Sequence, residues 1–117
     1  MAHTRIKGQR KGLSVWNVGD KEYYKLYDTV IVDFNHDSEG RTVTLNTGGW
    51  KTNHTKNCMN DFLRRFGFGV YQKDFVWYVR GREVSFSFDV DKVTFTIIDT
   101  PMGLQIGNFR EEVIRTA

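Results

Sequence analysis

The segment "NTGGWKTNHTKNCMNDFLRRFG" (residues 46–67) contains the point where the sequence changes from alternating to helical spacing. Its apolar series with helical spacing consists of Cys58, Met59, Phe62, Leu63 and Phe66. Such a series lies on one face of an α-helix. Thr52 or Asn53 is suited to cap the N-terminus, because a side-chain oxygen there accepts from the first free N–H groups. Gly67 is suited to end the helix in the left-handed conformation. The segment therefore predicts one amphipathic helix.

Alternating runs rich in β-branched and aromatic residues lie on both sides of this helix. We expect strands at 13–16, 22–34, 41–47, 69–72, 75–80, 83–90 and 92–98. In the second run, alternation places Val30 and Val32 on one face and Ile31 on the other. The last two runs alternate cleanly between apolar and polar residues. This pattern indicates antiparallel pairing, with one face of the sheet on a core and the other in water.

These elements predict an α+β fold. We expect an antiparallel sheet of about five to seven strands with one amphipathic helix packed on one face, in the order strands, helix, strands. The expected organisation is a basic, flexible arm over 1–13, a single α+β domain over 14–100 and a tail or short element over 101–117. Pro101, the single proline of the chain, marks the expected end of regular structure.

The positive charge is concentrated at the N-terminus. The net charge of the chain is +3, whereas residues 1–13 contain Arg5, Lys7, Arg10 and Lys11 and no acid. The remaining residues therefore carry a net charge of −1. A basic arm on a nearly neutral domain suits contact with a polyanion, although a solubilising terminus has the same composition.

Several classes of function lack support in the sequence. The 117 residues contain a single Cys, so no internal disulfide is possible, and no Cys/His set has zinc-site spacing. We find no nucleophile elbow, phosphate loop or nucleotide fingerprint. Cys58 lies on the apolar helix face and is expected to be a core residue. We therefore expect no enzyme, metal or cofactor. No apolar run reaches membrane-spanning length, and no signal peptide is evident, which favours the cytoplasm.

The polar face of the predicted helix is the main candidate site. It combines amides with cations and consists of Asn53, Lys56, Asn57, Asn60 and Arg64. Amides hydrogen-bond base edges and sugars, and cations meet phosphates, so this face suits DNA or RNA. Lys51 lies beside the helix start. A solvated face with no ligand has the same pattern.

The corner before the helix is a second candidate. Gly48, Gly49 and Trp50 precede a helix N-terminus, where free N–H groups and the positive end of the dipole favour an anion. The same residues suit a tight corner with Trp50 as a core residue. Alternatively, Trp50, Tyr71 and Tyr78 are candidates for stacking on bases.

Aromatic residues also allow a protein partner. The chain has 3 Trp, 5 Tyr and 9 Phe, and Tyr23, Tyr24 and Tyr27 fall close together. Exposed aromatic side chains and an open sheet edge are typical of binding surfaces. Filling of the core or a homodimer interface would explain them equally well.

The stretch "LNTGGWKTNHTKNCMNDFLRRFGFGVYQKDFVWYV" (45–79) resembles a segment of small proteins of tailed bacteriophages. The shared features are the Asn-Thr-Gly-Gly-Trp corner, the helix after it and the Val-Tyr-Gln-Lys hairpin leading into an aromatic strand. The resemblance covers about a third of the chain and includes no catalytic motif. It implies a phage or prophage protein that acts in the cytoplasm of the bacterial host.

The favoured hypothesis is a non-enzymatic, phage-type binding protein that contacts nucleic acid through its basic arm and the Asn/Lys helix face. One alternative is an inhibitor of a host defence complex, comparable to an anti-CRISPR protein, or of a transcription complex. Another is sequestration of an anionic nucleotide at the Gly48–Gly49 corner.

Overall fold

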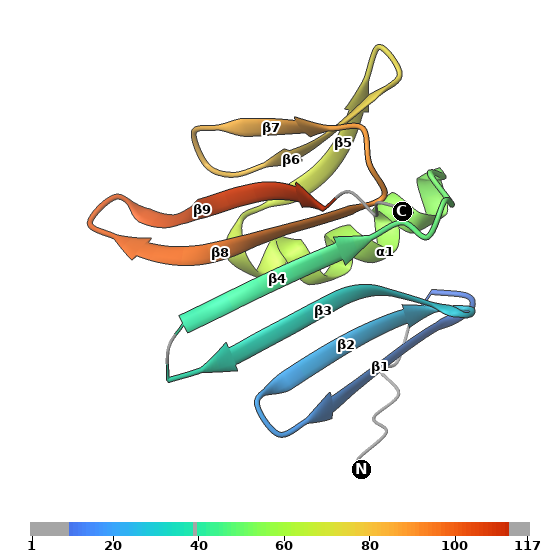
Figure 1. Cartoon of the computed structure of the whole chain (residues 1–117), viewed down its shortest axis with the longest axis horizontal. Coiled ribbons are helices and arrows are strands. Elements are labelled where there is room, and N and C mark those ends of the chain that lie inside the picture. The colour runs from blue at the N-terminus through green and yellow to red at the C-terminus, as the bar shows by residue number, and fades with distance from the viewer. Residues whose placement is uncertain (1–9, 39, 113–117) are drawn as a thin grey trace, which may run out of the picture.

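The computed structural model describes residues 10–38 and 40–112, which contain nine β-strands and one α-helix (Figure 1). In chain order the elements are β1 (Leu13–Val18), β2 (Lys21–Leu26), β3 (Thr29–Asp37), β4 (Gly40–Asn46), α1 (Asn53–Leu63), the 3-10 helix η1 (Arg64–Phe66), β5 (Gly69–Lys73), β6 (Val76–Arg80), β7 (Ser85–Phe88), β8 (Lys92–Thr100) and β9 (Gly103–Glu112).

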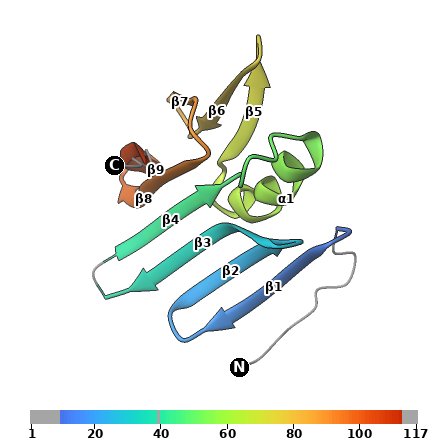
Figure 2. The ribbon, with the colours of Figure 1, turned by 45° about the vertical axis from the view of Figure 1, so that its right-hand side comes forward.

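The α+β fold expected from the sequence is wrong, because the described chain is mostly β. Its strands form a six-stranded sheet, ordered β1-β2-β3-β4-β8-β9, and a three-stranded sheet, ordered β5-β6-β7. All pairings are antiparallel. The helix has 11 residues and is therefore too short to cover the large sheet alone. The small sheet extends the structure beyond α1, as the two views of the ribbon show (Figures 1 and 2).

The helix itself forms where the spacing predicts it. The Thr52 side chain caps α1 by accepting from the Thr55 N–H at 3.2 Å. Gly67 ends the helical segment at a φ of 77°. The fully buried side chains of its apolar face are Cys58, Met59, Phe62 and Leu63. This face contacts β2 and β3, and Phe62 lies against the rings of Tyr24 and Phe34.

The helix and the small sheet form an insertion between β4 and β8. These two strands pair directly in the large sheet, although residues 47–91 separate them in sequence. The two ends of the insertion are joined by Thr47, whose N–H donates to the Asp91 carbonyl at 2.9 Å and whose hydroxyl donates to the Asp91 carboxylate at 2.6 Å. The insertion thus leaves and re-enters the large sheet at one point.

The last two predicted strands belong to different sheets. The run 83–90 forms β7, which pairs with β6, whereas the run 92–98 forms part of β8, which pairs with β4 and β9. Alternation in a sequence reports which side of a strand is buried, but it does not report the partner of that strand. The alternating pattern is therefore compatible with two sheets as well as with the single sheet that we expected.

The long run 22–34 is two strands rather than one. The chain turns at Tyr27 and Asp28, and Tyr27 takes a positive φ of 52°. A bulge opposite Tyr24 and Lys25 then breaks the alternation of β3. Because a bulge adds one residue to one strand, Ile31 and Val32 are both buried, where alternation placed them on opposite faces.

The segment expected to be a tail or short element contains β9. This strand spans Gly103–Glu112 and pairs with β8 along its length. Residues 113–117 of that segment, like residues 1–9 of the basic arm, lie outside the described residues.

Candidate nucleic-acid interface

The described part of the basic arm is joined to α1. Two of its predicted contacts, Arg5 and Lys7, lie outside the described residues. Arg10 makes a two-pronged ion pair with Asp61, with Nε 2.8 Å from Oδ2 and a terminal nitrogen 3.2 Å from Oδ1. The guanidinium of Arg10 is thus held by the protein, although both side chains remain about one-third exposed.

Lys11 lies beside the start of α1. Its carbonyl oxygen is 2.8 Å from Nε2 of His54. Because a carbonyl oxygen only accepts, Nε2 carries the proton in this hydrogen bond. The Lys11 side chain is exposed. Lys51 is also exposed, and its ammonium group donates to the carbonyl of Asp89 at 3.0 Å.

Two residues of the predicted helix face serve contacts within the protein. The Asn60 side chain accepts from the N–H of Val70 at 2.6 Å and donates to the carbonyl of the same residue at 3.1 Å. It therefore ties α1 to the edge of β5. The ammonium group of Lys56 donates to Gln72 at 3.3 Å and lies 5.5 Å from the centre of the Trp77 ring.

The other residues of the face differ in their surroundings. Arg64 is exposed, donates to the Asn60 carbonyl and lies 3.3 Å from Asp61. Asn53 and Asn57 are exposed. The exposed amides of the face are thus Asn53 and Asn57, whereas Lys56 and Asn60 are engaged with neighbouring strands.

The N–H groups of the Gly-Gly-Trp corner are engaged within the turn. Gly48 donates to the Asn46 side chain at 2.9 Å, and Gly49 donates to the Thr47 hydroxyl at 3.2 Å. The Trp50 N–H donates to the Thr47 carbonyl at 2.9 Å. An anion held by these groups would therefore compete with hydrogen bonds that already exist.

Backbone conformation and close packing explain why glycine occupies positions 48 and 49. Gly48 and Gly49 have φ values of 62° and 87°, a region that side chains disfavour. A Cβ atom at Gly48 would also lie 2.7 Å from Cγ2 of Thr29. The glycines therefore let the turn lie against the start of β3.

The turn presents Trp50 to solvent. This side chain is 67% exposed, so it is not the core residue that the corner alternative assumed. The other two candidates for stacking are engaged with each other, since the rings of Tyr71 and Tyr78 are parallel within 9° with centres 5.0 Å apart.

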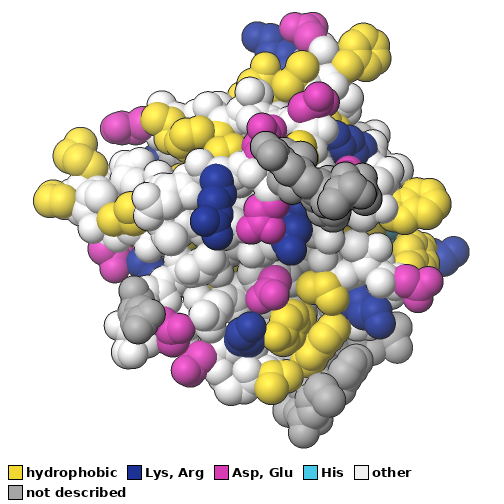
Figure 3. Space-filling view, in the orientation of Figure 1, with side chains coloured by type: hydrophobic (Ala, Val, Ile, Leu, Met, Phe, Trp, Pro, Cys, Tyr) yellow, Lys and Arg dark blue, Asp and Glu magenta, His cyan; other side chains and the backbone are white. Residues whose placement is uncertain are grey.

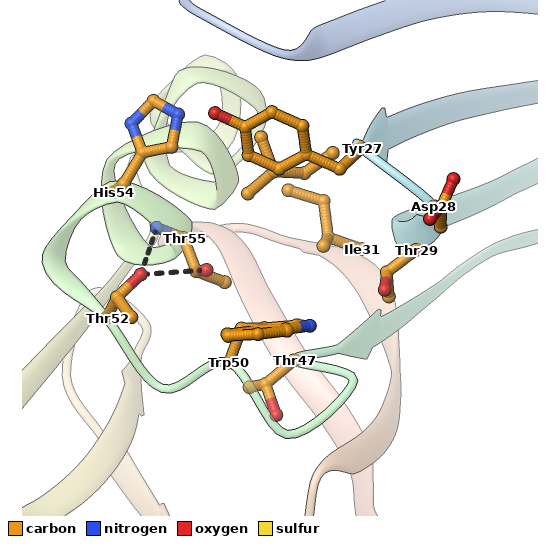
Figure 4. A pocket seen from close by; sticks show the side chains of 10 residues that line it. Tyr27, Asp28, Thr29, Ile31, Thr47, Trp50, Thr52, His54 and Thr55 are labelled. Carbon is orange, nitrogen blue, oxygen red and sulfur yellow. Dashed lines mark hydrogen bonds between the residues drawn. The ribbon is translucent and has the colours of Figure 1, made fainter.

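A pocket of about 450 Å³ lies beside Trp50. Its base includes the buried side chains of Leu26 and Ile31. Trp50 and Tyr27 lie on opposite sides of the opening, and His54 stands at one end (Figure 4). The pocket is therefore an apolar slot between two aromatic side chains, at the start of α1.

Tyr27 is exposed but held in position. Its side chain is 60% exposed, and its N–H donates to the Gly12 carbonyl at 2.9 Å. The ring lies so close to Gly12 that a Cβ atom there would be 2.4 Å from Cε1 of the tyrosine. The His54 ring lies 6.5 Å from the Tyr27 ring, centre to centre. Sequence reasoning grouped Tyr27 with Tyr23 and Tyr24 as aromatic surface for a protein partner and did not place it beside the Gly-Gly-Trp corner. The available signal was the length of the run 22–34, which exceeds an ordinary strand and calls for a turn within it.

The charge is mixed on one face of the described structure. Cations and acids are interspersed over the face shown in Figure 3, without an extended region of one sign.

Burial raises the pKa of the Cys58 thiol to about 11, which keeps it protonated at neutral pH. Within residues 10–38 and 40–112, no group of three His, Cys, Asp or Glu side chains is placed to share a metal ion. The helix in this part of the chain is not of a length and apolarity that would cross a membrane.

The structure thus defines a small, mostly β protein with an aromatic-walled pocket where its helical insertion begins. Residues 11–96 match the family described as Kyanoviridae Gp96 protein. Because the match spans most of the chain, the protein belongs to this family of phage proteins, and the expected phage origin is confirmed. Neither the curated proteins nor the solved structures include a match to the chain.

Proposed function

We propose that this phage protein is a non-enzymatic binding protein that contacts nucleic acid at the start of α1, with its basic arm alongside. The supporting observation is the position of Lys11, which joins the arm to His54 at the rim of the pocket. Lys11, the last of the four cations of residues 1–13, thus lies on the same side of the molecule as the exposed Trp50 and Tyr27. This gathers charge for phosphates and aromatic surface for bases at one site.

The helix face has a smaller part in this proposal than in the sequence-based hypothesis. Asn60 and Lys56 hold β5 and β6, so their loss would affect the fold as well as binding. The exposed candidates are Lys11, Lys51, Asn53 and Asn57, with Arg64 further along the helix. Their contacts would supply affinity that is largely independent of sequence.

The test is the salt dependence of binding to a labelled single strand and to a labelled duplex, measured by fluorescence anisotropy. We expect affinity that falls steeply with salt. A variant without residues 1–9 lacks Arg5 and Lys7, and the slope of log affinity against log salt should decrease by about 1.4 for a single strand if both meet phosphates.

A matched pair of variants locates the contact. Lys11→Ala should reduce the salt slope by about 0.7. Lys21→Ala removes another exposed lysine, at the end of β2 away from Tyr27, and should leave the slope unchanged. Absence of binding to either strand at low salt would refute the nucleic-acid function, and equal effects of the two variants would refute its location.

A second candidate function has a separate observation in its favour. Phe75, at the tip of the β5–β6 hairpin, is 95% exposed and has a φ of 68°. Hydrophobic side chains protrude at this tip, at the top of the view in Figure 3. A solvent-facing aromatic residue is suited to anchor a protein complex, as an inhibitor of a host defence or transcription complex would require.

The two functions separate by salt and by variant. An inhibitor should retain one host protein from an extract at high salt, and Phe75→Gly should lose it while Trp50→Ala retains it. If Phe75→Gly captures the same protein as the wild type, the hairpin tip is not the anchor.

A further inference from the structure

We propose that the pocket between Tyr27 and Trp50 receives one unpaired nucleobase of a single-stranded nucleic acid. This inference rests on the proposed function and specifies its ligand. The site is a built cavity of about 450 Å³ whose walls are two exposed aromatic side chains from different turns. Figure 4 shows the two side chains on either side of the opening, with Ile31 between them at the base.

The turns that carry the two walls are held by contacts within the protein. Tyr27 is held by its backbone hydrogen bond to Gly12 and by contact of its ring with that glycine. Trp50 extends from a turn in which three successive N–H groups are hydrogen-bonded and Gly48 lies against Thr29. Exposed aromatic side chains on rigid turns lose little conformational entropy on binding, so they favour a flat ligand between them.

The charges at the rim distinguish a nucleobase from a purely apolar ligand. His54 and Asp28 stand on opposite sides of the pocket (Figure 4). The Lys11 carbonyl accepts from His54, so this exposed lysine lies on the His54 side. A phosphodiester is attracted to that side and repelled by the Asp28 carboxylate. A base in the slot and a backbone that leaves past His54 would match this distribution.

The ligand must be unpaired. A base within a duplex exposes only its edges, whereas an unpaired base can lay one face on the Trp50 ring and contact Tyr27 across the pocket. Single strands and loops present bases whose faces are accessible. DNA and RNA share this chemistry, and so does a free nucleotide, so the ligands tested must separate these sources.

The experiment compares ligands of equal charge. Labelled single-stranded oligonucleotides of one length are prepared as DNA, as RNA and as a DNA backbone with abasic positions throughout, together with the corresponding duplex and a mononucleotide. Binding to the full-length protein is measured at one low salt concentration. We expect either single strand to bind about ten-fold more tightly than the abasic backbone or the duplex.

Variants test the walls of the slot. Trp50→Ala should weaken single-strand binding about ten-fold, and Trp50→Phe, which keeps an aromatic face, should restore most of it. Both should leave binding of the abasic backbone unchanged, because that ligand uses only the cations. Phe75→Ala removes a still more exposed aromatic side chain elsewhere and should have no effect. Thermal unfolding verifies that each variant is folded.

The outcomes separate this inference from the proposed function. If single strand, abasic backbone and duplex bind equally and Trp50→Ala has no effect, the pocket proposal is overturned while nucleic-acid binding stands. If the mononucleotide binds as tightly as the oligonucleotides and Trp50→Ala abolishes it, the base slot stands and the nucleic-acid function is overturned. If none of the ligands binds, both are overturned.

Discussion

The β2–β3 and β5–β6 turns each hold an aromatic residue at positive φ, Tyr27 at 52° and Phe75 at 68°. Turns of this kind ordinarily use Gly, Asn or Asp, because a larger side chain is strained there. Tyr27 packs its ring on Gly12 and forms one wall of a pocket. Phe75 is 95% exposed, so packing within the protein does not offset its strain. One turn uses its aromatic residue in the fold, and the other presents it to solvent.

This difference shows that an exposed aromatic side chain of this protein can still be held by contacts within the fold. The Tyr27 side chain is 60% exposed, yet its ring contacts Gly12. The Phe75 turn, in contrast, is held by the pairing of β5 with β6. Strain of about 1 kcal/mol or more at such a residue persists where the surrounding structure fixes it, often at binding sites. The two turns therefore mark the two candidate sites of the proposals.

The largest expected effect comes from disrupting the contact between Gly12 and the Tyr27 ring. Gly12→Ala should destabilise the protein by about 3 kcal/mol, because the new Cβ meets the tyrosine ring and Gly12 has a φ of 76°. The matched control is Gly19→Ala. Gly19 has a φ of 57° with open space around it, so the cost there should be about 1 kcal/mol. Urea unfolding measures both, and equal losses would show that the ring contact has no energetic role.

A smaller effect is expected at the other wall of the pocket. Gly48→Ala should cost about 2 kcal/mol, since its Cβ meets Thr29, whereas Gly49→Ala faces open space and should cost about 1 kcal/mol. The same unfolding measurement applies. A larger loss at Gly49 than at Gly48 would contradict the packing of this turn against β3.

The direct contrast of the two turns should be smaller and of opposite sign. Phe75→Gly should stabilise the protein by about 1 kcal/mol, because glycine relieves the left-handed strain and little packing is lost. Tyr27→Gly relieves the same strain but loses the contact with Gly12, so we expect no stabilisation. Stabilisation of equal size in both variants would remove the distinction between the turns.

The smallest effect sets the pH range for these comparisons. Burial raises the pKa of Cys58 from 9.0 to about 11. A raised pKa in the folded state means that stability is fully present below pH 9 and decreases as pH rises toward 11. At pH 9.5 the wild type should lose about 0.8 kcal/mol that a Cys58→Ala variant does not lose. Parallel stability curves for the two proteins between pH 8 and 10 would show that the thiol is not shielded.

Prediction from sequence succeeded where the pattern is local. The helix, its Thr52 cap and its Gly67 terminus follow from spacing and capping chemistry within a few turns of chain. It failed for the turn at Tyr27 and Asp28, because Asp28 is a single turn-favouring residue within a long run rich in β-branched and aromatic residues. The pocket could not be predicted from the sequence either, because its two walls come from separate turns. These turns are positioned by the contacts of Gly12 with Tyr27 and of Gly48 with Thr29.

The sequence by itself determined one amphipathic helix, a set of alternating strands, a basic N-terminal segment and a phage origin. The helix, the strands and the basic segment depend on neighbouring residues or on composition, and the phage origin was implied by the resemblance of residues 45–79 to phage proteins. Only the tertiary structure decided that the strands form two sheets, that the Asn60 side chain hydrogen-bonds the backbone of β5 and that Tyr27 lies across a cavity from Trp50. Side-chain periodicity specifies which face of an element is buried, but the partner of that face is selected by packing between segments far apart in the chain.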